Sequence, residues 1–452
     1  MRIAPRQLAD AAEIARRWIR YQAMLWDVPS ISFGISHGGR VVMLDAIGTA
    51  DIATERPATP DATGYRCASI TKTMTATLVM QQVEAGRMRL DEPIATYLPW
   101  LRRVPHARDI SIRHLLIHGG GVIRDGSNTW GDDDFPDREM VHAEVSQRLS
   151  FAEPASTFRY SNIAYILLGE ALESVTGRPF DALLQRSVLG PLGLKGSAPS
   201  LTPRVRRTIA TGYYRRRPGE VRHPSRHADA RAFAPAGGLV STVPDLLDYQ
   251  HAHFPGGSGL ISDLSKREMQ RTQWQRPEEP NYGLGWMIWH VDGVAIRGHS
   301  GGFPGFTTKI GFSPESALCA AVLMNTNGPV PGLALDMIYH SAVWVVRRWA
   351  DAAETARGHS RASVGRFAGH YRGDIGEMTI VRINRSLYIV DPEMTMPLAS
   401  AARLWPDGAR RFTIVEGDDY GHFGEEVSFA VDAAGRSVAM RYGPHSLRRS
   451  DI

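Results

Sequence analysis

A serine and a lysine three positions apart, Ser69 and Lys72, offer a nucleophile with a base beside it. On a helix, residues at this spacing share one face with Cβ atoms roughly 5–6 Å apart, so the amine can reach the hydroxyl. Lysine is otherwise rare, since the chain has only Lys195, Lys266 and Lys309 besides. The pair predicts a serine that is activated by a neighbouring base for covalent catalysis.

The segment that carries this pair has to be a helix, and its sequence predicts one. Ile70, Met74 and Leu78 recur at four-residue spacing, and Gly86 stands where helices commonly end. Alternating threonines in the same segment would also suit a strand, and Ser69 alone could be a helix cap before an exposed lysine. In the helical interpretation Ser69 lies at an N-terminus, where free N–H groups favour developing negative charge.

Two later segments place polar side chains at the borders of predicted elements. The first has Tyr160 and Asn162 ahead of an apolar helix pattern; read alone, they could be a core aromatic and a helix cap. The second follows a predicted strand and contains four residues of interest: His299, Ser300, Gly301 and Gly302. Loop-to-helix and strand-edge positions can present side chains and backbone N–H groups in defined directions.

Taken in order, the segments 69–72, 160–162 and 299–301 resemble the motifs of the serine β-lactamase and penicillin-binding-protein superfamily. The likeness is greatest to the class C β-lactamase-related branch, which includes esterases, D,D-peptidases, D-aminopeptidases and transesterases. Further phrases typical of that branch stand at residues 115–118, 158–162, 236–239 and 282–286. The resemblance covers roughly residues 25–350.

The resemblance implies an α/β (α+β) fold, with an antiparallel sheet flanked by helices, a mainly helical subdomain and the site between them. It also implies an acyl-enzyme on Ser69, with Lys72 as free amine or Tyr160 as phenolate taking its proton. Either group would need a pKa shift of about 3 units to act near neutrality. Asn162 would orient Lys72 and the substrate amide, and the N–H groups of Ser69 and Gly302 would form the oxyanion hole.

This chain departs from the pattern of true β-lactamases in its third motif. Their commonest form begins with a lysine whose charge helps to hold the substrate carboxylate, whereas His299 stands here, as in some peptidase and esterase relatives. We therefore do not expect efficient β-lactam hydrolysis. Ala155 also replaces a glycine before the tyrosine motif, and Gly119 and Gly120 replace the Thr-Ser that often follows the histidine.

These motifs favour a serine hydrolase that cleaves ester or amide bonds, of the esterase or D-amino-acid peptidase type. The alternatives are a transesterase or acyltransferase, a weak β-lactamase, and a binding protein that has lost the chemistry. A small-molecule or peptide acyl compound is the expected substrate, with no cofactor and no metal.

Composition limits the other classes of function. The net charge of +5 comes mostly from arginine spread along the chain without interleaved aromatics, so nucleic-acid binding is not expected. The sequence shows no apolar run near the 18 residues of a membrane span and no signal peptide, which predicts a cytoplasmic protein. Cys67 and Cys319 lack metal-ligand spacing and are expected to be buried fillers.

A chain of 452 residues predicts more than one domain. We assign residues 1–350 to the β-lactamase-like hydrolase domain and the polar stretch 351–364 to a linker. Short predicted strands between turns over residues 365–452 indicate a small antiparallel β-barrel-like domain. The irregular, arginine-rich stretch 204–231 is expected to lie on the surface.

Overall fold

The chain forms two compact units, which we describe separately. The computed structural model describes residues 1–126, 135–215, 217, 219–257, 259–278, 280–354, 361–416 and 423–450. One unit comprises Val28–Gly332, and the other combines Met1–Asp27 with Leu333–Ile452. The division into domains at 351–364 stays a prediction, and the contacts of the structure group residues 1–27 with the C-terminal part of the chain.

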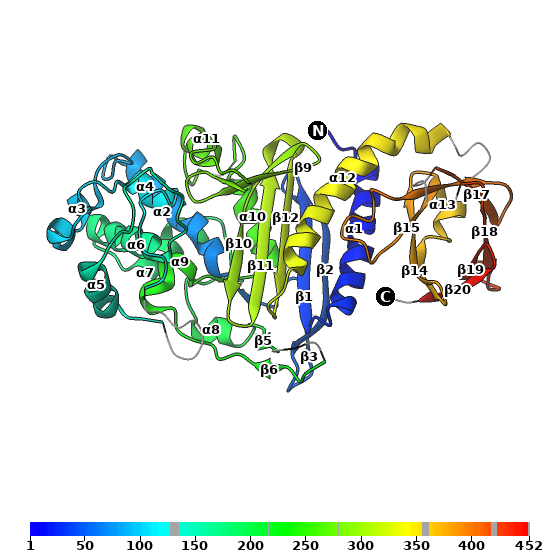
Figure 1. The fold of residues 1–452 in the computed structure, drawn as a ribbon, viewed down its shortest axis with the longest axis horizontal. Coiled ribbons are helices and arrows are strands. Elements are labelled where there is room, and N and C mark those ends of the chain that lie inside the picture. Colours follow the sequence, from blue (N-terminus) through cyan, green and yellow to red (C-terminus); the bar gives the residue numbers. More distant parts are fainter. Residues whose placement is uncertain are drawn as a thin grey trace. The chain divides into compact units, whose positions relative to one another are not determined.

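An eight-stranded sheet forms the centre of the first unit (Figure 1). Its order is β3-β2-β1-β12-β11-β10-β9-β8, and every pairing in it is antiparallel. The strands are β1 (Ser30–His37), β2 (Arg40–Asp51), β3 (Arg56–Pro57), β8 (Asn281–Tyr282), β9 (Met287–Val291), β10 (Val294–Phe303), β11 (Phe306–Ser313) and β12 (Leu318–Met324). The neighbours β1 and β12 are buried almost throughout, as expected of central strands, and β1 and β2 form a hairpin.

Helix α10 (Val243–Ala252) packs on this sheet against β12, β1, β11 and β2. Gly34 of β1 allows the close approach, because a Cβ at that position would lie 2.7 Å from Val243 Cγ1. The short pairs β4 (Tyr65–Arg66) with β7 (Val240–Ser241) and β5 (Tyr213–Tyr214) with β6 (His223–Pro224) form two small separate sheets. The predicted antiparallel sheet flanked by helices is confirmed.

A helical subdomain lies beside the sheet in the same unit (Figure 1). Its helices and turns are η1 (Ala68–Ile70), α2 (Thr71–Glu84), α3 (Ile94–Tyr97), η2 (Pro99–Arg103), α4 (Ile112–Leu116), α5 (Arg138–Gln147), α6 (Asn162–Thr176), α7 (Phe180–Leu184), η3 (Gln185–Leu189), α8 (Pro203–Arg206), η4 (Arg231–Phe233) and α9 (Ala234–Gly237). The unit also contains α11 (Asp263–Gln270) and η5 (Pro314–Ser316).

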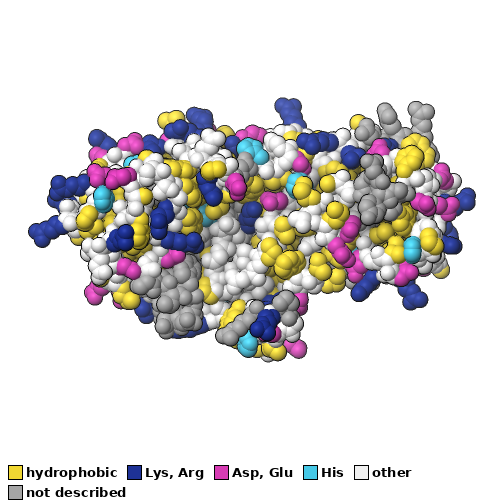
Figure 2. Space-filling model, in the orientation of Figure 1, with side chains coloured by type: hydrophobic (Ala, Val, Ile, Leu, Met, Phe, Trp, Pro, Cys, Tyr) yellow, Lys and Arg dark blue, Asp and Glu magenta, His cyan; other side chains and the backbone are white. Residues whose placement is uncertain are grey.

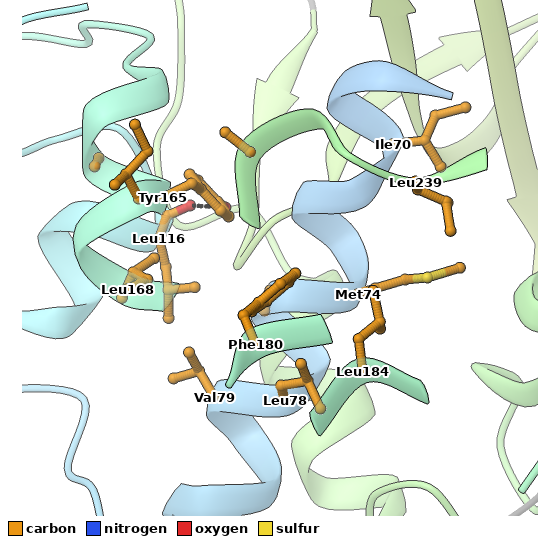
Figure 3. Packing of buried hydrophobic residues seen from close by; sticks show 14 of the residues in the cluster. Ile70, Met74, Leu78, Val79, Leu116, Tyr165, Leu168, Phe180, Leu184 and Leu239 are labelled. Atoms are coloured by element: carbon orange, nitrogen blue, oxygen red, sulfur yellow. Dashed lines mark hydrogen bonds between the residues drawn. The ribbon is translucent and has the colours of Figure 1, made fainter. Parts of the chain in front are cut away.

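Helix α2 is the buried centre of this subdomain. Ile70, Met74 and Leu78 lie against side chains of α6, α7 and the segment before β7 (Figure 3). The threonines that suggested a strand are buried, and their hydroxyls bond back to the helix; Thr73 Oγ1, for example, donates to the Ile70 carbonyl at 2.8 Å. Satisfied in this way, small polar side chains are compatible with a helix that is packed on all sides.

The second unit contains a closed barrel of eight strands, which confirms the predicted β-barrel (Figure 1). The strands are β13 (Gly369–Gly373), β14 (Gly376–Ile383), β15 (Ser386–Val390), β16 (Ala402–Pro406), β17 (Arg411–Glu416), β18 (Glu426–Val431), β19 (Ser437–Tyr442) and β20 (His445–Ser450). Pairing of β13 with β20 closes the barrel, so it has no free edge strand. Apolar side chains, among them Tyr371, Phe412 and Phe429, fill its interior.

Three helices accompany the barrel: α1 (Pro5–Leu25), α12 (Val330–Glu354), which begins just before this unit, and α13 (Arg361–Gly365). Helix α1 packs on β14 of the barrel. Asp10 makes two of its buried polar contacts: the carboxylate lies 3.0 Å from Arg382 Nη2 and accepts the Asn384 N–H at 2.8 Å. Residues 1–27 therefore belong with a part of the chain more than 300 positions away.

Positively and negatively charged side chains both lie on the surface. On the face shown in Figure 2, Lys and Arg side chains are scattered among Asp and Glu side chains. That face therefore carries no large field of one sign. Among the described residues, no helix combines the length and the apolar character needed to cross a bilayer.

Candidate active site

Ser69 lies in a tight turn between a short strand and a helix. The α-helix begins at Thr71, so Ser69 belongs to the 3₁₀ turn η1 rather than to the first turn of α2 itself. Ala68, directly before it, has a positive φ of 47°, a conformation that costs a residue other than glycine about 1–3 kcal/mol. Such strain persists only where the surroundings hold the backbone in place.

The residue ahead of that turn is held from two sides. The Cys67 N–H donates to the Leu239 carbonyl at 2.9 Å, and the Cys67 carbonyl accepts from Thr308 Oγ1 at 3.2 Å. On β10, Gly301 passes so close that a Cβ there would lie 2.1 Å from the Cys67 oxygen, whereas nothing lies within 4 Å of a Cβ at Gly302. The third motif therefore lies against the serine turn, with open space in front of Gly302.

The amine of Lys72 is buried beside the serine. Its Nζ lies 3.0 Å from Ser69 Oγ, 2.6 Å from Asn162 Oδ1 and 2.8 Å from the Ala236 carbonyl oxygen. The side chain is 0% exposed, and burial lowers the pKa of Lys72 well below its ordinary value. The nearby Asp125 carboxylate opposes this shift, and Arg124 adds to it.

The cap of α6 leaves Asn162 available for this contact. Ser161, in extended conformation, is the N-cap residue, and its hydroxyl accepts the Ala164 N–H at 2.9 Å. Asn162 is therefore not the cap, the alternative that its position allowed. Its side chain instead joins Lys72 through Oδ1 and the carboxylate of Asp125 through Nδ2.

Tyr160 completes the cluster from the loop before α6. Lys72 Nζ lies 5.0 Å from the centre of its ring, and the phenol makes a hydrogen bond with Ser69. Burial raises the pKa of Tyr160 above its ordinary value, although the bond with Ser69 opposes the rise. Burial thus favours the neutral phenol of Tyr160 and the neutral amine of Lys72 alike.

Behind these groups runs a buried chain of side-chain hydrogen bonds. The Ser161 N–H donates to His118 Nδ1 at 3.1 Å, so His118 carries its proton on Nε2, which donates to Tyr282 Oη at 3.1 Å. The Tyr282 hydroxyl then donates to His299 Nε2 at 2.9 Å, and His299 Nδ1 donates to the Ser300 carbonyl at 2.6 Å. Each ring has one donor and one acceptor nitrogen, which is the neutral form of histidine.

The electrostatics of both histidines agree with that assignment. Burial, followed by the charge of Lys72, lowers the pKa of His299 to about 3 and that of His118 well below its ordinary value. The His299 ring is 0% exposed. It therefore contributes an uncharged, hydrogen-bonded ring at the position where true β-lactamases have a lysine.

The structure brings together the first two predicted motifs and the backbone of the third. Ser69, Lys72 and Asn162 are joined by contacts within hydrogen-bonding distance, and Tyr160 lies over Lys72. Gly301 and Gly302 border the serine turn, and Ser300 contacts Met287.

Sequence reasoning missed several partners of these residues. Asp125 and Arg124 belong to no motif of the sequence, yet the carboxylate bonds Asn162 and both charges act on Lys72. Tyr282 and Ala236 stood in phrases typical of the branch, but no role was assigned to them. Their contacts depend on a carbonyl and a phenol whose direction only the folded backbone determines.

Comparison with known proteins identifies the family. Residues 19–343 match the family described as Beta-lactamase, so the chain belongs to the Beta-lactamase family. The predicted resemblance to serine β-lactamases and penicillin-binding proteins is thereby confirmed. Proteins similar to this chain include a peptidase, an esterase and a β-lactamase, which supports a general serine hydrolase.

Two relatives and one solved structure illustrate the likeness. Penicillin-binding protein 4 of Amycolatopsis lactamdurans is 29% identical over 59% of this chain and 72% of its own length. Esterase EstB of Burkholderia gladioli is 28% identical over 66% of this chain and 86% of its own. The octameric penicillin-binding protein homologue from Pyrococcus abyssi aligns over 96% of this chain and 98% of its own, with a TM-score of 0.66 at 23% identity, and shares the fold.

Proposed function

We propose that this protein cleaves ester or amide bonds through an acyl-enzyme on Ser69, with Lys72 as the base. The observation that carries the proposal is the surroundings of the Lys72 amine, which lies within hydrogen-bonding distance of two carbonyl oxygens and Ser69 Oγ. A small-molecule or peptide acyl compound is the proposed substrate. The proposed site residues are Ser69, Lys72, Tyr160, Asn162, His299, Ser300, Gly301 and Gly302.

The choice of Lys72 over Tyr160 as base rests on donors and acceptors. A neutral amine has two N–H donors and one lone pair. The carbonyl oxygens of Asn162 and Ala236, at 2.6 and 2.8 Å, take both donors, and the lone pair then faces Ser69 Oγ at 3.0 Å. Burial favours the neutral forms of both Lys72 and Tyr160. It therefore favours the free amine that can act as a base and disfavours the phenolate.

The reaction follows from these positions. Ser69 Oγ attacks the acyl carbon as its proton passes to Lys72 Nζ, and the N–H groups of Ser69 and Gly302 hold the oxyanion. As the bond to the leaving alcohol or amine breaks, Tyr160 gives that atom a proton and regains one from the Lys72 ammonium. Water then attacks the acyl carbon and gives a proton to Lys72, which returns it to Ser69 Oγ as the acid leaves.

The third motif supports esters and amides over β-lactams as substrates. A β-lactam presents a carboxylate, and His299 offers it no charge because the ring is buried, neutral and bonded to Tyr282 and Ser300. A neutral acyl ester or amide has no carboxylate, so it needs no positive charge at position 299. We therefore propose the esterase or amidase branch of the family as the functional class.

The test compares wild type and Ser69→Ala on p-nitrophenyl acyl esters, D-aminoacyl anilides and a chromogenic cephalosporin. We expect ester or anilide turnover in the wild type, a loss of at least about 10³-fold in the variant, and little cephalosporin turnover. Ser174→Ala, which removes another hydroxyl of the same unit, is the matched control and should keep full activity.

Mass spectrometry after exposure to a fluorophosphonate should find the adduct on Ser69. Full turnover by Ser69→Ala would refute the proposal, and the lack of any adduct in the wild type would favour a binding protein. Products from added alcohol or amine acceptors, formed faster than acid, would instead identify an acyltransferase.

A further inference from the structure

We propose that Asp125 is a positioning residue that holds the side-chain amide of Asn162 with its oxygen towards Lys72 and thereby aims the base at Ser69. The inference deepens the proposed function and rests on it. Asp125 touches none of the reacting atoms, so its effect has to pass through Asn162.

An asparagine amide has an oxygen and a nitrogen of nearly the same size, so its neighbours decide which way it faces. Here the neighbours are of opposite kinds. An ionised carboxylate only accepts hydrogen bonds, so the Asp125 side requires the Asn162 NH₂ group. The oxygen is left for the other side, where it accepts from Lys72 Nζ at 2.6 Å.

Asp125 itself is anchored on both flanks. Its Oδ2 accepts from Arg124 Nε at 2.9 Å, and its side chain is 17% exposed against 66% for Arg124, so the carboxylate is the inner member of the pair. The Arg124 carbonyl in turn accepts the N–H groups of Asn162 and Ile163 at 2.8 and 3.1 Å. These bonds tie the loop to the first turn of α6, on which Asn162 stands.

The opposite orientation of the amide would disable the base. With its NH₂ group towards Lys72, Asn162 would present donors where the amine needs an acceptor. The amine would then turn its lone pair towards Asn162 and an N–H towards Ser69 Oγ. A base that donates to the nucleophile cannot take its proton, so catalysis requires the orientation that Asp125 imposes.

The charges around Lys72 give this role a signature in the pH profile. The amine is faced by Asp125 and Arg124 from the loop before α5, by His118 and His299 from the buried chain, and by the rings of Tyr160 and Tyr165. Both histidines are neutral. Asp125 raises the pKa of Lys72 and Arg124 lowers it, so removing either charge shifts the acid limb of activity in opposite directions.

The experiment measures kcat/KM against pH for Asp125→Ala and Asp125→Asn, with the ester that the wild type turns over. In the alanine variant the Asn162 amide is free to turn. The kcat/KM of this variant should fall about 100-fold, as expected of a misplaced catalytic group, with unchanged thermal stability. The asparagine variant can place its one carbonyl oxygen towards Asn162 and give up the bond from the exposed Arg124, so it should stay within about tenfold of wild type. Its acid limb should move to lower pH, because Lys72 has lost the nearby negative charge.

Arg124→Gln is the matched control for charge. It removes the guanidinium that lowers the pKa of Lys72, together with its bond to Asp125, and leaves the bond of Asp125 with Asn162 and the backbone bonds of residue 124 in place. Its acid limb should therefore move to higher pH, with the plateau of kcat/KM within about tenfold of wild type.

Wild-type activity and profile in Asp125→Ala would overturn the inference. The inference is also overturned if kcat/KM falls equally in both Asp125 variants and in proportion to the fraction of protein that is folded. Such losses would indicate a structural role. If the alanine variant does not fold, an unshifted acid limb in Asp125→Asn is enough to reject it. These outcomes are separate from failure of the proposed function, which Ser69→Ala alone tests.

Discussion

At the scale of single residues, neutral histidines are the distinguishing feature of this site. The hydrogen-bond chain from Ser161 through His118 and Tyr282 to His299 leaves no proton position undetermined. A lysine at position 299 would bring an ammonium into this buried space, and that would cost several kcal/mol unless it were paired. The neutral histidine avoids that cost and leaves burial as the main cause of the lowered pKa of Lys72.

Tyr282→Phe tests this chain. The change removes the acceptor of His118 Nε2–H and the donor to His299 Nε2, and leaves two buried nitrogen atoms without partners. We expect the first unit to lose about 1–3 kcal/mol of its free energy of unfolding. Hydrogen exchange of the amides of β10 measures the change. Tyr214→Phe is the control, because it removes an exposed hydroxyl and should have no effect. If the β10 amides were equally protected from hydrogen exchange in both variants, the role assigned to Tyr282 would be contradicted.

At the scale of elements, close approach of backbones builds the site. The turn η1 is held between β10 on one side and the segment that precedes β7 on the other, and this keeps Ala68 in its left-handed conformation. Ala155, which stands where relatives often have glycine, also has a positive φ of 62°. The loop before Tyr160 thus keeps the backbone shape that a glycine would adopt freely.

Gly301→Ala tests the approach of β10 to the serine turn. The new Cβ would lie 2.1 Å from the Cys67 oxygen and 2.4 Å from Thr308 Oγ1, so β10 and η1 must separate. We expect a loss of about 1–3 kcal/mol in stability from overpacking and about 100-fold in kcat/KM from the displaced oxyanion donors. Thermal unfolding and ester turnover measure both effects.

Gly259→Ala serves as the control, because nothing lies within 4 Å of a Cβ at that position. It should change stability by no more than about 0.5–1 kcal/mol. An active, stable Gly301→Ala protein would show that the strand can shift without disturbing the serine.

At the scale of the whole molecule, the two ends of the chain share one unit. Helix α1 packs on the barrel through a buried carboxylate, and Gln22 Nε2 adds a bond to the Pro392 carbonyl at 2.9 Å. The barrel interior is filled with apolar side chains, so its strands enclose a core and not a ligand. A barrel expressed as residues 365–452 would lack the helix that covers β14.

Asp10→Ala tests the contribution of α1. Removing the carboxylate leaves the Asn384 N–H without its acceptor and Arg382 without this ion pair, which should cost the barrel unit about 1–3 kcal/mol. Hydrogen exchange of the β14 amides reports on this unit separately from the hydrolase unit. Glu13→Ala removes an exposed carboxylate of the same helix and should cost less than about 1 kcal/mol. Equal protection in the two variants would mean that Asp10 does not couple α1 to the barrel.

Local patterns were sufficient for much of the fold and for the first two motifs. Four-residue spacing of Ile70, Met74 and Leu78 identified α2 in spite of its threonines, because burial on all sides outweighs local propensity. The β-rich tail was identified by its short predicted strands between turns. Partners across the fold could not be found in this way, since a carbonyl such as that of Ala236 carries no sequence signal.

The sequence by itself determined the family, the serine and lysine at helical spacing, and the histidine in place of a lysine in the third motif. These are properties of residue type and order along the chain. Only the tertiary structure gave the surroundings of Lys72 and Tyr160, the direction of the Asn162 amide, and the packing of the first helix on the barrel. Those depend on desolvation, on the direction of hydrogen-bond donors and on contacts between distant residues, and such properties exist only once the chain is folded.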